Sequence, residues 1–495
     1  NRGLNLGTRV VIYGAGASGR QLLPALSQMD EYYPVAFVDD NRALQGQVIH
    51  GVSVFAPEKL PWLVEKYEAK KILLAMPSAS RARKNEVIKT LEGLPCEVLS
   101  IPGMVDLVEG KARIDSLRKV VITDLLGRDP VSPIPELISR NINGKTVMVT
   151  GAGGSIGSEL CRQIIKNKPS QLILFELSEF SLYSIDSELR SLSLSQDFKV
   201  KIYPILGNVQ DKEHLERLIK AFNVNTIYHA AAYKHVPLVE FNVLDGVRNN
   251  IFGTLSCAQA AASCGVENFV LISTNKAVRP TNTMGATKRM AELVLQALAK
   301  ETDKTCFSMV RFGNVLGSSG SVVPLFEKQI AAGGPVTLTH ENITRYFMTI
   351  PEAAQLVIQA GAMGTGGDVF VLDMGEPVKI IDLAQRMITL QGLTVRDDKN
   401  PYGDIAIKTT GLRPGEKLYE ELLIGDNVSA TQHPRIRTAN EVMLPWSEMN
   451  MILHDLDKAC CEFDYESVRE ILLQAPAAFN PTDGICDLLW NKKVS

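Results

Sequence analysis

Two glycine-rich turns, each placed between a short apolar run and a helical pattern, constrain the fold of this chain most strongly. Val10 to Tyr13 precede the turn at 14–19, and Lys145 to Val149 precede Thr150-Gly-Ala-Gly-Gly-Ser-Ile-Gly157. The second turn runs into a helix that we expect to begin at Ser158. A strand, a glycine turn and a helix in this order are typical of the start of a nucleotide-binding α/β fold. The sequence therefore predicts two such domains.

The first domain has a second strand, Val35 to Val38, which ends at Asp39 and Asp40. A carboxylate at this distance is suited to a ribose hydroxyl. Another apolar strand, Ile72 to Ala75, continues the alternation. Two interpretations of the glycines stay open: they bind a nucleotide or another phosphate ligand, or they only allow a tight turn and close helix packing.

The second glycine turn carries a fuller dinucleotide pattern. Gly151, Gly154 and Gly157 would let the backbone approach a pyrophosphate at the helix N-terminus. The next strand ends at Glu176, about 20 residues further on. A carboxylate there would accept a hydrogen bond from a ribose 2′-hydroxyl and would repel a 2′-phosphate. We therefore expect NAD rather than NADP. Further candidate cofactor contacts are Ser155, Ile156, Asn208 and Ala230.

Apolar strands continue at 202–206, 226–229, 269–272 and 309–312, with helical stretches between them. This rhythm is typical of parallel sheets. We predict an α/β protein with two doubly wound Rossmann-like domains, the second of which carries a small C-terminal α/β substrate lobe. The expected parts are an N-terminal domain at 1–115, a proline-rich linker at 116–143, a catalytic domain at 144–395 and a lobe at 396–495 that includes segments from about 314–350.

Composition narrows the possible ligands. The net charge is −3 in 495 residues, which provides no global field for nucleic acid. The eight cysteines form no CxxC pattern and have no metal-ligand spacing with the seven histidines, so we expect reduced core cysteines in a cytosolic protein and no metal. The sequence contains no apolar run of about 18 residues and begins at Asn1, from which we expect a soluble chain that lacks an upstream segment.

Several longer motifs carry a family resemblance. The segments 150–157 and 229–235, and Ser273-Thr274 with Lys276, resemble extended short-chain dehydrogenases. The segments 177–183, 234–240, 311–320, 344–349 and 411–417 are similar to the polysaccharide-biosynthesis branch, which includes UDP-N-acetylglucosamine 4,6-dehydratases. The N-terminal domain resembles the extra domain of the large, membrane-anchored form. The resemblance implies an NAD enzyme that acts on a UDP-sugar at the cytoplasmic side of the inner membrane, and we also expect a homo-oligomer.

The usual catalytic pair of this family is changed in the chain. Short-chain dehydrogenases place a Tyr four residues before a Lys, and here Met284 precedes Lys288. Met cannot transfer a proton, so one interpretation is a non-catalytic relative. The large dehydratases, however, resemble this chain in carrying Met at this position. The resemblance then implies that Thr274 contacts the sugar O4 and that Lys288 binds the cofactor ribose.

The resemblance also assigns the elimination step. Lys276 is implied as the base that removes the C5 proton, and it should be neutral when it acts, through burial or a nearby Lys288. The acid that protonates the C6 hydroxyl is normally Asp, but Asn275 stands at its position. An amide cannot deliver a proton at pH 7. Either the protein is a natural variant or the Asp has been replaced by a near-isostere, and the intact surrounding motif favours replacement.

A UDP-sugar requires cations and polar groups around it. Arg345 and Arg413 are the candidates for the diphosphate, because a guanidinium pairs two oxygens at once. Glu416 is a candidate acceptor for the uridine ribose, and Asn314 stands where the family contacts the nucleotide-sugar. Lys234 and His235 are candidates for lining the sugar pocket. We expect His229 to pack at a strand end instead.

Two other functions compete with a dehydratase. A UDP-sugar 4-epimerase shares the hydride step, but it needs no C5 base, which argues against it because Lys276 is present. A catalytically silent module that senses NAD and a UDP-sugar would use the same two folds without turnover. Product analysis separates the three.

Overall fold

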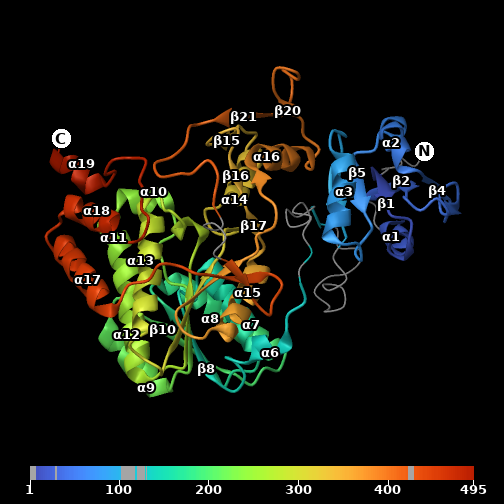
Figure 1. The fold of residues 1–495 in the computed structure, drawn as a ribbon. Helices are drawn as coiled ribbons and strands as arrows, with labels where there is room; N and C mark the ends of the chain where they lie inside the picture. Colours follow the sequence, from blue (N-terminus) through green and yellow to red (C-terminus); the bar gives the residue numbers. More distant parts are fainter. Residues whose placement is uncertain are drawn as a thin grey trace. The chain divides into compact units, whose positions relative to one another are not determined.

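The computed structural model describes residues 7–27, 31–101, 118–119, 129, 131–421 and 428–494. They form two compact units (Figure 1). Unit 1 consists of 1–130, 321–342 and 378–410, and unit 2 of 131–320, 343–377 and 411–495. The domain boundaries expected from the sequence stay predictions, and most of the expected linker lies outside the described residues.

Unit 1 contains a seven-stranded sheet in the order β3-β4-β2-β1-β5-β6-β7. The strands β2, β1, β5 and β6 run parallel, which confirms the strand, turn and helix alternation expected there. Its elements are β1 Thr8–Tyr13, α1 Ala17–Ser27, β2 Tyr32–Val38, β3 Val48–Ile49, β4 Val52–Phe55, η1 Pro57–Lys59, α2 Leu60–Tyr67, β5 Lys71–Leu74, α3 Arg81–Leu91, β6 Glu97–Ser100 and β7 Arg118–Lys119.

Two later segments of the chain belong to unit 1 as well. They include a three-stranded parallel sheet in the order β15-β21-β20. The elements are α14 Val322–Ala331, β15 Val336–Leu338, β19 Val378–Lys379, α16 Ile380–Thr389, β20 Val395–Arg396 and β21 Ile405–Thr409. Arg386 of α16 pairs with Glu92 at 2.8 Å, so this part also contacts the N-terminal sheet domain within the same unit.

Unit 2 is built on a nine-stranded sheet in the order β10-β9-β8-β11-β12-β13-β18-β23-β22. The seven strands from β10 to β18 are parallel, and β23 and β22 add antiparallel pairs at one edge. The strands are β8 Thr146–Thr150, β9 Gln171–Glu176, β10 Lys201–Leu206, β11 Thr226–His229, β12 Asn268–Ile272, β13 Cys306–Arg311, β18 Asp368–Leu372, β22 Val428–Ala430 and β23 Ile436–Ala439.

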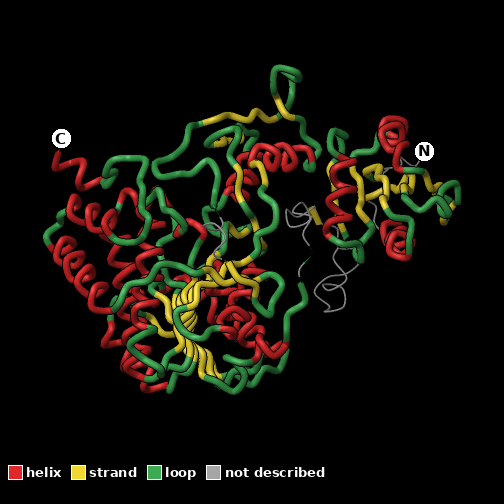
Figure 2. Tube along the Cα trace, viewed as in Figure 1, coloured by secondary structure: helices red, strands yellow, loops and turns green. Residues whose placement is uncertain are grey.

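Helices cover both faces of this sheet (Figure 2). Because side chains alternate along a strand, Val147 and Val149 pack into one core cluster and Met148 into the other. The first cluster includes α6 Pro135–Ser139, α7 Ser155–Lys166, α8 Glu179–Ser195 and α15 Ile350–Met363. The second includes α9 Lys212–Phe222, α11 Val243–Val247, η2 Arg248–Phe252, α12 Gly253–Cys264, α13 Thr283–Leu298, α17 Trp446–Cys461 and α18 Tyr465–Gln474.

The expected α/β class with doubly wound parallel sheets is confirmed. The remaining elements of unit 2 are α10 Val236–Phe241, η3 Asn275–Ala277, β14 Asn314–Val315, β16 Thr344–Arg345, β17 Phe347–Met348 and α19 Leu488–Val494. All eight cysteines are free, as expected, but the expectation that they are all core residues was wrong at four positions, because Cys461 is exposed and three others are only half-buried: Cys264, Cys306 and Cys486.

Candidate active site

The strand order places a topological switch at β8. The chain continues from β8 to β9 on one side, whereas β11 lies on the other side of β8. Ligands of open parallel sheets bind outside the carboxyl ends of the strands at such a point. Thr150 ends β8 and His229 ends β11, and the two strands are joined further by a hydrogen bond from the Ala230 N–H to the Thr150 carbonyl at 3.1 Å.

The glycine turn after β8 lies close to neighbouring backbone. Gly151 has φ +66°, and a Cβ there would lie 2.8 Å from the Cα of Ala231. A Cβ on Gly157 would lie 2.0 Å from the carbonyl oxygen of Gly151. Helix α7 begins at Ser155, three residues before the expected Ser158, and its N-cap Gly154 makes no side-chain capping bond. The first N–H groups of α7 therefore meet no capping side chain, as an anion-binding helix N-terminus requires.

Glu176 lies at the end of β9 and faces this turn. Its Oε2 accepts a hydrogen bond from the Gly153 N–H at 3.0 Å, and its Oε1 accepts from the N–H groups of Leu177 and Ser178 at 2.9 and 3.0 Å. A carboxylate offers about four lone-pair sites, so acceptor capacity remains for a ribose hydroxyl. Asn208, which follows β10, accepts from the Gln210 N–H at 2.9 Å through its Oδ1.

His229 is a buried structural residue, as the sequence predicts. Its Nδ1 lies 2.8 Å from Thr150 Oγ1 and its Nε2 lies 3.1 Å from Thr254 Oγ1. Burial, and then the charge of Lys288, lower the pKa of His229 to about 3. The imidazole is therefore neutral and joins β8, β11 and α12.

The turn after β12 brings three predicted residues together. Thr274 caps η3 and accepts from the Lys276 N–H at 3.3 Å, with Asn275 between them. Asn275 is 3% exposed, and neither its Oδ1 nor its Nδ2 has a hydrogen-bond partner among the described residues. An unpaired buried amide is costly, so this side chain is suited to a ligand group that completes its hydrogen bonds.

Helix α13 carries Met284 and Lys288, one turn apart and both buried. Lys288 is 5% exposed, and its side chain makes no hydrogen bond or ion pair within the described parts of the chain. Burial lowers the pKa of Lys288 to about 8, although the charge of Glu292 raises it. A buried lysine without a partner is suited to a cofactor hydroxyl.

The side chain of Lys276 is held by a residue that the sequence did not predict. Its Nζ lies 3.2 Å from Glu420 Oε1 and 3.2 Å from Asn314 Oδ1. The Glu420 side chain is 5% exposed; burial raises its pKa, but the charges of Lys276 and Arg345 outweigh burial and lower it. In the sequence, Glu420 stands beside Glu421 with nothing to distinguish the two, so only the fold identifies it.

Arg345 and Glu416 are paired with each other. Arg345 Nη2 lies 3.0 Å from Glu416 Oε1, and its Nε lies 3.5 Å from Glu420. Nη1 donates to the carbonyls of Thr344 and Leu418 at 2.8 and 3.3 Å. The Arg413 residue is exposed, and its backbone N–H donates to Glu416 Oε2 at 3.2 Å. The predicted diphosphate and ribose residues therefore lie together, with most donors of Arg345 already used.

Lys234 and His235 follow β11 and precede α10. Partial desolvation, and then the charge of Lys276, lower the pKa of Lys234, although the residue is exposed overall. A Cβ on Gly320 would lie 2.5 Å from the His235 ring, so the 317–320 loop reaches this place. The Ser319 N–H also donates to Ser155 Oγ at 3.4 Å. The loop therefore lies beside both the glycine turn and the predicted sugar pocket.

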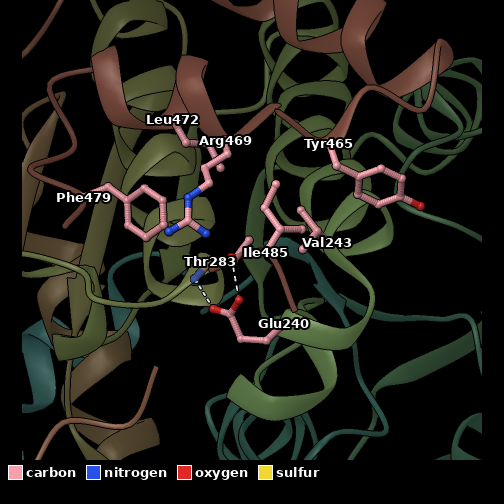
Figure 3. A pocket seen from close by; sticks show the side chains of 8 residues that line it. All are labelled: Glu240, Val243, Thr283, Tyr465, Arg469, Leu472, Phe479 and Ile485. Carbon is pink, nitrogen blue, oxygen red and sulfur yellow. Dashed lines mark hydrogen bonds between the residues drawn. The ribbon is translucent and has the colours of Figure 1, made fainter. Parts of the chain in front are cut away.

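A small pocket lies elsewhere in unit 2, at the start of α13 (Figure 3). Its carboxylate, Glu240, accepts from the Thr283 N–H at 2.5 Å and from Thr283 Oγ1 at 3.0 Å. The lining residues are Glu240, Val243, Thr283, Tyr465, Arg469, Leu472, Phe479 and Ile485. None of the predicted site residues lines it, and Glu240 fixes the first turn of the helix that carries Lys288.

The sequence family described as polysaccharide biosynthesis protein matches residues 147–441. The chain is also 46% identical to the capsular polysaccharide biosynthesis protein CapD of Staphylococcus aureus, over 90% of this chain and 74% of that protein. The chain belongs to the polysaccharide biosynthesis protein family. This family membership confirms the branch indicated by the motifs.

Other relatives of the chain are named as one of two different enzymes. Over 58% of the chain and 80% of the relative, it is 32% identical to a UDP-glucose 4-epimerase of Rickettsia bellii and 30% identical to an inverting UDP-N-acetylglucosamine 4,6-dehydratase of Campylobacter jejuni. The X-ray structure of Pen from Bacillus thuringiensis is similar with a TM-score of 0.53 and 31% identity, over 63% of this chain and 98% of Pen.

Within the described ranges, no helix is long and apolar enough to cross a membrane. The same residues include no cluster of three or more His, Cys, Asp or Glu side chains suited to a metal ion.

Proposed function

We propose that the chain is an NAD-dependent 4,6-dehydratase of UDP-N-acetylglucosamine, impaired by Asn275. The observation that carries this proposal is the turn at Thr274, Asn275 and Lys276, whose central amide is buried and unpaired. An epimerase has no need for an amine beside that position. The named dehydratase among the relatives supports the same reaction class.

The residues of unit 2 fit NAD. Gly151 and Gly157 leave no room for a Cβ beside the turn, Glu176 retains acceptor capacity, and Lys288 is a buried cation without a partner. When bound, NAD would accept the hydride from the sugar C4 and return it at C6. The 2′-hydroxyl of the adenosine ribose would donate to Glu176, and Lys288 would hold the nicotinamide ribose. Ser155, Ile156, Asn208 and Ala230 are proposed to line the remaining cofactor surface.

The chain's own groups would then act on the sugar. Thr274 would hydrogen-bond O4, whose proton passes to solvent as the hydride leaves C4. Lys276 would remove the C5 proton, which the 4-keto group makes acidic, and return it to C5 when the hydride arrives at C6. Asn275 hydrogen-bonds the C6 hydroxyl but has no proton to give, so departure of that hydroxyl is slow. Lys234, His235 and Asn314 line the sugar pocket. Arg345, Arg413 and Glu416 bind the UDP.

A UDP-sugar 4-epimerase is the second candidate. Two observations favour it: a relative of that name is 32% identical, and an amide at 275 does not supply the acid that elimination requires. Incubation with UDP-N-acetylglucosamine, followed by NMR of the sugar, separates the candidates. A 4-keto-6-deoxy product supports the dehydratase, a C4 epimer supports the epimerase, and unchanged sugar in the presence of bound NAD and UDP supports a silent sensing module.

We also propose that the chain forms a homo-oligomer, which sedimentation analysis would test. Attachment of the protein to the cytoplasmic side of the inner membrane stays a prediction.

A further inference from the structure

Glu420 belongs to none of the groups assigned above, yet it is one of the most buried carboxylates near them. Its side chain is 5% exposed, and it lies within 3.5 Å of two cations, Lys276 and Arg345. The amide of Asn314 donates to its Oε1 and Oε2 at 3.3 and 3.1 Å. A buried carboxylate with this many partners is held in one orientation.

The same three residues fix the Lys276 amine. Asn314 Oδ1 accepts from Lys276 Nζ at 3.2 Å, while Asn314 Nδ2 donates to Glu420. Asn314 therefore connects the amine and the carboxylate, and the three side chains form a closed set. The Lys276 side chain is 27% exposed, so part of it is open to solvent.

The charges around the Lys276 amine show which group holds it. A carboxylate that accepts a charge-assisted hydrogen bond from an amine attracts it and fixes its position. The facing charges are Glu420 at 3.2 Å and the neighbouring Lys234, with Arg345 behind Glu420 and Glu416 behind Arg345. Among these, Glu420 is the anion in direct contact with Lys276.

We propose that Glu420 is a positioning residue for Lys276: together with Asn314 it holds the amine in one place. The role of Lys276 as the base rests on the proposed function, but the contact between Glu420 and Lys276 does not depend on it. Two measurements therefore test the contact and the role separately.

The first measurement uses the chain as it is and needs no turnover. Lys276 is labelled with an amine-acetylating reagent across a pH series, and the modified peptide is quantified by mass spectrometry. An amine held in an ion pair reacts slowly. Glu420→Gln keeps the shape and removes this contact, so labelling of Lys276 should rise about threefold, the usual effect of a partly exposed ion pair.

The matched control is Glu421→Gln, in the adjacent position. Glu421 lies 3.8 Å from both Arg279 and Lys417 and makes no contact with Lys276. It should leave Lys276 labelling unchanged. If Glu420→Gln does not fold, Asn314→Ala gives a second test, because loss of the connecting amide should also alter Lys276 labelling relative to the same control.

The second measurement is the kinetics of dehydration in the Asn275→Asp background. With Glu420→Gln added, the maximal rate should fall and KM should change little, because the amine is then no longer held beside the substrate. Glu416→Gln, which removes the other carboxylate from Arg345, should change UDP affinity without lowering this rate.

The outcomes are distinguishable. Unchanged Lys276 labelling in Glu420→Gln and in Asn314→Ala overturns the inference. Increased labelling with an unchanged maximal rate upholds the Glu420 contact but shows that Lys276 is not the base, which counts against the proposed function.

Discussion

The carboxylate of Glu176 accepts a hydrogen bond from the Gly153 N–H at 3.0 Å, which joins the end of β9 to the glycine turn after β8. Two parts of the proposed NAD site, the ribose acceptor and the pyrophosphate turn, are thus fixed to each other before any ligand binds. A preorganised site loses less conformational freedom on binding.

Glu176→Ala should weaken NAD binding by about 1–3 kcal/mol, the usual cost of an unpaired polar partner. Calorimetry on the purified chain measures the change. Glu179→Ala, an exposed position in the first turn of α8, is the control. Equal NAD affinity in the Glu176 variant and the control would remove Glu176 from the ribose site.

Asn275→Asp should raise the rate of dehydration by at least about a hundredfold, because general acid catalysis contributes about 10² to 10⁴ in rate. Substrate affinity should change little, since the two side chains are nearly the same shape. Asn275→Ala is the companion variant and should stay slow. If Asp at 275 gives the same rate as Asn, another group protonates the leaving hydroxyl.

Arg345→Ala and Arg413→Ala should both weaken UDP binding in calorimetry. The two variants should differ in stability. Arg345→Ala leaves the buried Glu420 with one cation fewer and should lower the melting temperature, whereas Arg413 is exposed and its loss should not. Unaltered UDP affinity in both would place the diphosphate elsewhere.

His229 predicts a pH dependence of stability. Its pKa is depressed to about 3 in the folded chain, below about 6.5 in the unfolded one, so its contribution is present above pH 6.5 and is lost as the pH falls towards 3. His229→Gln should reduce the slope of unfolding free energy between pH 6 and 4 by up to about 1.4 kcal/mol per pH unit. Denaturant titrations at each pH measure this slope, with His454→Gln on the exposed side of α17 as control. An unchanged slope would contradict a neutral, buried His229.

NAD should copurify with the chain, because a hydride that is returned in every cycle gives no reason to release the cofactor. Steady turnover of the Asn275→Asp variant should accumulate no free NADH, which absorbance at the nicotinamide band would report. Stoichiometric NADH release would instead indicate a simple dehydrogenase.

The sequence by itself determined the parallel α/β class, the two glycine turns and the residues of the turn at 274–276. These features depend on local rules: apolar runs alternate with helical patterns, and the turn geometry excludes a Cβ at Gly151 and Gly157. It also indicated that His229 is structural. The predicted start of α7 at Ser158 was wrong by three residues, because the helix begins at Ser155. A helix start without a side-chain cap leaves little signal in the sequence.

Only the tertiary structure decided which of these residues meet. Glu420 reaches Lys276 from 144 positions along the chain, and nothing local separates it from Glu421. Lys288, expected as one possible neighbour of Lys276, is buried and its side chain has no partner among the described residues, while Arg345 is already paired with Glu416 and Glu420. Charge partners far apart in sequence are chosen by packing and distance, which a sequence pattern does not contain.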